Sequence, residues 1–276
     1  MGLGILIYGE SGTGKTASLR EFKSDELVLV NVAAKPLSFK GKFDEKLTSD
    51  SYREIKKLIN NTNKKVIVID DAQYLMANEF MRRATEKGFE KFTEIAQNFW
   101  DLVQTVRNLK EDVVVYFLMH SDRDQFGNEK VKTIGKMLDE KITLEGMFTI
   151  VLKTVVQDGK YYFSTQNNGI DTVKSPIGLF DSNLVANNLK AVDNAIRGYY
   201  DFEVDNTKSA YEEIQKEEPK KSLAQELAEE KTAPTPKVRV VENTPAVEET
   251  VVEQPKVVEV ETADATPTRR RRRIAE

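Results

Sequence analysis

The 276-residue chain contains no cysteine, one histidine and one tryptophan. Without cysteine it can form neither a disulfide nor a thiolate metal site, and this composition suits a reducing compartment. No apolar run approaches the roughly 18 residues that a membrane-spanning helix needs. The first residues also lack the basic segment and the apolar run of a secretion signal. We therefore expect a cytoplasmic protein with no membrane partner.

The first 200 residues also have almost no excess of either sign of charge. The whole chain has 41 basic and 45 acidic residues, for a formal net charge of −4. Residues 201–276 hold 13 of the basic and 18 of the acidic residues, a net of −5, so the first 200 residues carry a net of +1. No overall basic field therefore marks the first 200 residues as a nucleic-acid-binding surface.

Short apolar runs alternate with amphipathic segments along the first 150 residues. Four runs are largely aliphatic, as in strands buried on both faces of a parallel sheet: residues 3–8, 27–32, 66–69 and 113–119. The segments between them predict helices over residues 15–22, 51–60 and 78–109. This alternation predicts an α/β domain with a mostly parallel sheet and helices on both faces.

The pattern changes near residue 149. Asp158-Gly159 separates residues 149–157 from residues 160–166, and this turn signal predicts a C-terminal antiparallel hairpin. A last helix is expected over residues 183–200.

We place the end of the folded domain at residue 204. Beyond it aromatic residues are nearly absent, and five prolines lie between residues 234 and 267. Such a segment cannot bury enough apolar area to offset the entropy of ordering it. Residues 205–276 are therefore predicted to be a disordered acidic tail, which ends in five consecutive arginines at 269–273.

The segment GESGTGKT, residues 9–16, matches the phosphate-loop pattern G-x-x-x-x-G-K-[ST] between a predicted strand and a predicted helix. Backbone N–H groups of such a loop face phosphates, its lysine reaches the β and γ phosphates of ATP, and its hydroxyl ligates Mg²⁺. We assign ATP binding to Gly9, Glu10, Ser11, Gly12, Thr13, Gly14, Lys15, Thr16 and Ala17, with Thr16 as a Mg²⁺ ligand. The alternative is a glycine-rich turn with a chance lysine.

A second motif is VIVIDD, in which an apolar run ends in two aspartates. We predict that Asp70 holds Mg²⁺ through water and that Asp71 polarises the attacking water. Asp71 could instead cap the next helical turn. Gln73 is a further candidate for positioning that water.

The single histidine, His120, follows the predicted strand 113–119. Ligands of α/β proteins bind at the carboxyl edge of the sheet, so we expect His120 to sense the γ-phosphate there. A purely structural histidine is the alternative.

Together GESGTGKT, VIVIDD, YFLMHSD, KVKTIGKMLDEKITLEGMF and GKYYFSTQNNG resemble a family of bacteriophage RecA-like core ATPases. These are AAA-family proteins related to phage single-strand-annealing recombination ATPases. The resemblance covers roughly residues 1–200. It implies a RecA-like P-loop fold, ATP hydrolysis, and work on single-stranded DNA in recombination or replication. A phage protein of this kind would act in the host-cell cytoplasm, as a homo-oligomer.

Residues 122–137 then read as a polar loop with four basic residues, Arg123, Lys130, Lys132 and Lys136. In RecA-like machines this region couples the nucleotide to DNA. Lys132 and Lys136 are candidates for phosphate contacts, either to DNA or to the ATP of a neighbouring subunit. A solvated basic loop is the alternative.

The side of the pocket that holds the nucleotide base is expected to involve Asn167, Asn168, Lys174 and Ser175.

Two other classes of function also use a phosphate loop. A small-molecule or nucleotide kinase would need an arginine-rich lid, whereas Arg82-Arg83 is the one arginine pair outside the tail. A nucleotide-dependent switch would recruit partners through the tail, and the tail could equally bind a replication or recombination protein. The paired aspartates and the basic loop favour the ATPase.

Overall fold

The structure is a computed structural model that describes residues 1–202. The predicted tail, residues 205–276, and the predicted boundary at residue 204 lie outside the described residues. Within them, nine strands form the sheet: β1 (Leu3–Gly9), β2 (Leu27–Asn31), β3 (Glu45–Leu47), β4 (Val66–Asp70), β5 (Val114–Arg123), β6 (Glu129–Val131), β7 (Ile150–Gln157), β8 (Lys160–Ser164) and β9 (Leu184–Ala186).

Four α-helices and three shorter helices cover or connect the strands of this described part. The α-helices are α1 (Tyr52–Asn61), α2 (Gln73–Arg82), α3 (Glu90–Arg107) and α4 (Leu189–Tyr199). The shorter helices are the 3₁₀ helix η1 (Thr16–Glu21), the π-helix η2 (Met137–Ile142) and the 3₁₀ helix η3 (Leu144–Met147). No helix within residues 1–202 has the length and apolar character needed to cross a bilayer.

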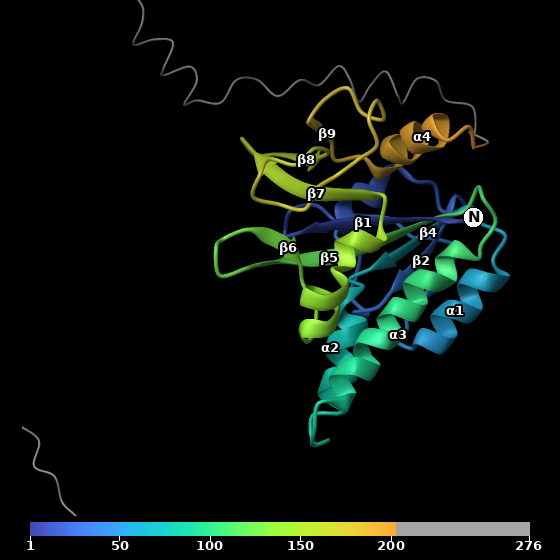
Figure 1. Cartoon of the computed structure of the whole chain (residues 1–276). Coiled ribbons are helices and arrows are strands. Elements are labelled where there is room, and N and C mark those ends of the chain that lie inside the picture. The colour runs from blue at the N-terminus through green and yellow to red at the C-terminus, as the bar shows by residue number, and fades with distance from the viewer. Residues whose placement is uncertain (203–276) are drawn as a thin grey trace, which may run out of the picture. The chain divides into compact units, whose positions relative to one another are not determined.

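The strand order brings the ends of several strands together. Strands β3, β2, β4, β5, β1 and β7 run parallel in that order, and β8 and β9 add antiparallel beyond β7 (Figure 1). Because β5 lies between β1 and β4, Gly9 is paired with His120, while Asn31 is paired with Asp70. The carboxyl ends of four neighbouring strands therefore meet at one edge of the sheet, where α/β proteins bind ligands.

Helices pack on both faces of the sheet because alternate strand residues point to opposite faces. Leu6 and Phe117 belong to the core on the face covered by α1, α2 and α3. Ile5 and Tyr116 belong to the core on the other face, against η1 and α4 (Figure 1). All four side chains are fully buried. The predicted mostly parallel sheet with helices on both faces is confirmed.

The single long helix predicted over residues 78–109 is wrong. Two helices, α2 and α3, occupy this region, and residues 83–89 separate them. Gly88, in this connection, has a φ of +93°, a left-handed conformation that a continuous right-handed helix cannot contain. The ammonium group of Lys91 then donates to the carbonyl oxygens of Arg83 and Glu86 and closes the turn. The amphipathic pattern continues across this break, so periodicity alone did not reveal it.

Two other predicted elements differ in extent. The last helix begins at Leu189 rather than at residue 183, because Leu184–Ala186 pairs with β8 as β9. Asn188 caps the helix by accepting a hydrogen bond from the Ala191 N–H.

The predicted polar loop 122–137 is partly a hairpin, since β5 continues to Arg123 and pairs antiparallel with β6. The hairpin at Asp158-Gly159 joins β7 and β8 where the sequence predicts it.

A buried ion pair attaches α4 to the sheet. Arg197 Nε lies 2.7 Å from Asp193 Oδ2, and the Tyr116 hydroxyl donates to Asp193 Oδ1 at 2.7 Å. The Arg197 guanidinium also donates to the carbonyl oxygens of Asp112 and Lys65. Burial raises the pKa of Asp193 despite these partners, so its charge depends on the arginine beside it.

Candidate functional site

The loop that leaves β1 wraps around the side chain of Lys15. Gly14 has a φ of +97°, which a residue with a side chain adopts only with strain. The Thr13 hydroxyl donates to the Glu10 carbonyl oxygen at 2.7 Å and lies 2.6 Å from the Thr154 hydroxyl, which ties the loop to β7. The predicted helix after the loop is the short 3₁₀ helix η1.

Lys15 is nearly buried inside this loop. Its ammonium group donates to the carbonyl oxygens of Gly9 at 2.9 Å and Glu10 at 2.7 Å. Burial lowers the pKa of Lys15 to about 8, although Asp71 and Asp70 oppose the shift. An anion entering the loop would therefore stabilise the charged form of Lys15, as a phosphate does.

Thr16 and Asp70 face each other across the floor of the site. The Thr16 hydroxyl lies 3.0 Å from Asp70 Oδ1 and 2.9 Å from Oδ2. Burial, followed by the charge of Asp71, raises the pKa of Asp70 to about 6. A cation would stabilise the ionised carboxylate, and hydroxyl and carboxylate oxygens are ligands that Mg²⁺ prefers. The two residues therefore fit the predicted Mg²⁺ site.

Asp71 connects two further groups of the site. Its Oδ1 lies 3.2 Å from His120 Nε2, and its Oδ2 lies 2.9 Å from the Lys35 ammonium group. Burial opposes ionisation of Asp71, but the hydrogen bonds from His120 and Lys35 outweigh it and lower the pKa to about 2. Helix α2 has Ala72 at its N-cap, with no side-chain cap, so Asp71 is not the helix cap considered from the sequence.

Gln73 holds the backbone beside the histidine. Its side-chain carbonyl accepts a hydrogen bond from the His120 N–H at 3.2 Å. The other end of the amide, Nε2, is buried and has no hydrogen-bond partner among the described residues. The Tyr74 ring packs edge-on against the His120 ring, with 6.2 Å between the ring centroids. His120 is therefore held within β5, at the last position paired with β1, by neighbours from the start of α2.

A cavity of about 350 Å³ unites these groups. Its lining includes most of the predicted site together with residues that sequence reasoning missed: Ser11, Gly12, Gly14, Lys15, Thr16, Ala17, Asn31, Lys35, Pro36, Ser38, Asp70, Asp71, His120 and Tyr161. Gly9, Glu10 and Thr13 are not among the lining residues, but their hydrogen bonds hold the loop and its lysine.

The residues predicted for the base side of the pocket do not line this cavity. Lys174 forms an antiparallel bridge with Val151 of β7, and the Asn167 side chain donates to the Asp171 carbonyl oxygen. Asn168 and Ser175 are also absent from the lining. None of the four lines the cavity of the phosphate loop, whose lining instead includes Pro36, Ser38 and Tyr161, and their role at the base stays a prediction.

A family model described as an AAA domain matches residues 1–175. The chain belongs to this AAA domain family. The matched region contains the phosphate loop, both aspartates of VIVIDD, and His120. No curated protein matches the chain. Membership in the family indicates a nucleotide-binding P-loop ATPase.

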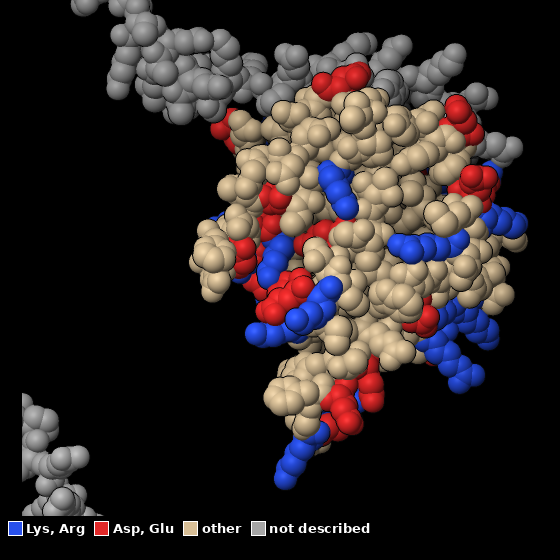
Figure 2. Space-filling model, viewed as in Figure 1, with Lys and Arg blue, Asp and Glu red and all other residues tan. Residues whose placement is uncertain are grey.

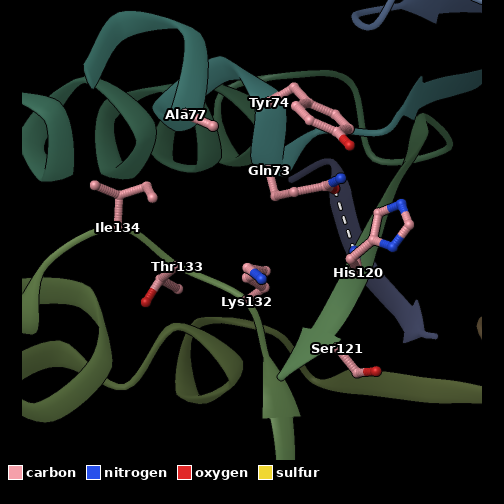
Figure 3. A pocket seen from close by; sticks show the side chains of 8 residues that line it. All are labelled: Gln73, Tyr74, Ala77, His120, Ser121, Lys132, Thr133 and Ile134. Carbon is pink, nitrogen blue, oxygen red and sulfur yellow. Dashed lines mark hydrogen bonds between the residues drawn. The ribbon is translucent and has the colours of Figure 1, made fainter. Parts of the chain in front are cut away.

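The AAA domain has a second cavity beside the first, and His120 lines both. This cavity measures about 260 Å³ and is lined by Gln73, Tyr74, Ala77, His120, Ser121, Lys132, Thr133 and Ile134 (Figure 3). Lys132 is tied to the strand end, because its backbone N–H donates to the His120 carbonyl oxygen at 2.8 Å. The structure thus brings Lys132 next to His120, although it does not line the cavity of the phosphate loop.

The basic residues of the 122–137 segment are mostly neutralised by acidic neighbours. Three of the four form ion pairs: Arg123 with Glu10 and Glu129, Lys130 with Asp139, and Lys136 with Glu140. Lys132 has no ion pair within residues 1–202 and is exposed. The face shown in Figure 2 carries both basic and acidic side chains on a largely uncharged described surface.

Proposed function

We propose that this AAA domain is a RecA-like ATPase that hydrolyses ATP with Mg²⁺ at the cavity of the phosphate loop. The observation that carries the proposal is the position of Asp71. It follows the carboxylate paired with Thr16, and it lies in the same cavity as Lys15. A phosphate site, a metal-ligand pair and a proton acceptor therefore share one space.

Each side chain has a distinct task in this proposal. Lys15 donates to the β and γ phosphates in place of the loop carbonyl groups that it now contacts, and it stabilises the charge that develops on the γ-phosphate. Thr16 and Asp70 would hold Mg²⁺, which neutralises charge on the phosphate oxygens when it is bound. His120, which lines the cavity and is hydrogen-bonded to Asp71, would sense the γ-phosphate.

Asp71 is the proposed general base. The oxygen of a water molecule bonds to the γ-phosphorus while its proton moves toward the Asp71 carboxylate, and the bond between the γ-phosphorus and the bridging oxygen of ADP breaks. ATP turnover tests the proposal. Phosphate should be released with Mg²⁺ present and fall to background after chelation, whereas no release under either condition would refute it.

The structure offers no support for the kinase alternative. Arg83 is held by ion pairs to Glu79, Glu86 and Glu94, and Arg82 is paired with Asp50. Neither arginine lines the cavity of the phosphate loop. Both arginines are therefore held in ion pairs at the end of α2 and form no arginine lid over the cavity of the phosphate loop.

We further propose that the protein is a phage-type homo-oligomer that acts on single-stranded DNA in recombination or replication. The sequence resemblance supports this role, and the exposed Lys132 supports it physically. Lys132 has no acidic partner among the described residues, so its charge is available to a phosphate of DNA or to the ATP of a neighbouring subunit. The tail would recruit a replication or recombination partner.

Replacing Lys132 with Ala should weaken single-stranded DNA binding. The slope of the logarithm of the binding constant against the logarithm of the salt concentration should become shallower by up to about 0.7, the effect of one DNA phosphate that the protein no longer neutralises. Lys57→Ala is the matched control, an exposed lysine of α1 outside the 122–137 segment. The measurement is the dissociation constant over a series of salt concentrations. If Lys132→Ala leaves the slope unchanged, the DNA-binding site lies elsewhere in the chain.

A further inference from the structure

Both carboxylate oxygens of the proposed base are already engaged by neighbouring side chains. One oxygen of Asp71 contacts His120, and the other contacts the Lys35 ammonium group. Each contact occupies an oxygen that could otherwise accept a proton from the attacking water. The departure of one of the two partners would therefore free an oxygen of Asp71 for that water.

Lys35 is the partner with freedom to move. Its side chain is 57% exposed, compared with 21% for His120 and 13% for Asp71. Its backbone is fixed at the same time, since the Asn31 side chain bonds both the carbonyl and the N–H of Lys35. The four-carbon side chain is flexible, but its backbone is fixed, so the ammonium group can move only within a limited space.

The space within reach of Lys35 is the phosphate cavity. Lys35 lines that cavity together with Lys15, Thr16 and Gly12. Lys15 and Lys35 thus present two cationic side chains to one cavity, and an anion bound there would be attracted by both.

We propose that Lys35 is a second phosphate-binding cation, which exchanges Asp71 for the terminal phosphate when ATP binds. This inference rests on the proposed ATPase function. The exchange places a positive charge on the γ-phosphate and removes one of the two partners of the Asp71 carboxylate. ADP lacks the γ-phosphate, so the ion pair between Lys35 and Asp71 stays closed in its presence. Lys35 thus makes the site respond to ATP rather than to nucleotide in general.

Nucleotide discrimination tests this inference. Dissociation constants for ADP and for a non-hydrolysable ATP analogue are measured with the unmodified chain, Lys35→Ala, Lys35→Arg and Lys40→Ala. Lys40 is the matched control, an exposed lysine of the same segment that does not line the cavity. Lys35→Ala should weaken binding of the analogue by about tenfold, the usual effect of removing a hydrogen bond to a charged group, and leave ADP binding nearly unchanged. Lys35→Arg should retain most of the discrimination.

The outcomes separate this inference from the ATPase proposal. If Lys35→Ala weakens ADP and the analogue equally, or affects neither, Lys35 does not contact the γ-phosphate and the inference is overturned. If the unmodified chain binds neither nucleotide, the ATPase proposal fails, and the role of Lys35 fails with it. Melting temperatures of the four proteins show whether each variant is folded.

Discussion

Replacing Asp71 with Asn should slow ATP turnover by about 10²- to 10⁴-fold, the usual contribution of a general base. The amide keeps the size of the carboxylate but cannot accept a proton from water. It also tolerates the left-handed backbone at this position, where φ is +59°. Affinity for ATP should persist, because the role proposed for Asp71 is toward water rather than phosphate. Turnover and ATP binding are measured on the same preparation.

Asp158→Asn is the matched control for this change. Asp158 is exposed, lies at the turn of the β7–β8 hairpin and also has a positive φ, +52°. The control should turn over ATP at the native rate. If Asp71→Asn does the same, Asp71 only positions Lys35 and His120, and if the variant loses ATP binding, its role is structural.

The second large effect concerns stability. Arg197→Ala should lower the free energy of unfolding by about 3–5 kcal/mol, because it leaves the carboxylate of Asp193 buried without its cation. Arg197 and Asp193 are each only 5% exposed at the side chain, so water cannot take the place of the missing partner. The substitution also removes the donors to the Asp112 and Lys65 carbonyl oxygens. Chemical or thermal unfolding gives the measurement.

Arg107→Ala provides the comparison, since this arginine is exposed near the end of α3. Its substitution should change the free energy of unfolding by no more than about 0.5 kcal/mol. Equal unfolding curves for the two variants would mean that the buried ion pair contributes little to the attachment of α4.

Local motifs made much of the site predictable. The phosphate loop is eight consecutive residues, and Asp70 ends an apolar run, so both can be recognised without knowledge of the fold. Lys35 and Tyr161 carry no such signal. They reach the cavity from the segment after β2 and from β8, and only the strand order places these elements beside the loop. The residues predicted for the base side have no local motif either, and the fold leaves them outside the lining of this cavity.

The fold shows the same division between local and long-range information. Buried strands are visible as apolar runs, and the Asp158-Gly159 turn marks its hairpin. The three-residue strands β3, β6 and β9 are too short to produce a periodic pattern, and each forms by pairing with a longer neighbour. The break between α2 and α3 depends on Gly88 and on the contacts of Lys91, which periodicity does not report.

We expect the loop at residues 9–16 and the adjacent aspartates to hydrolyse ATP. Phosphate release is measured for the unmodified chain and for Lys15→Ala, both with Mg²⁺. Removing the cation proposed to contact the γ-phosphate should slow release by about 10²-fold or more. Equal rates for the two proteins, or no release by the unmodified chain, would mean that this site does not hydrolyse ATP.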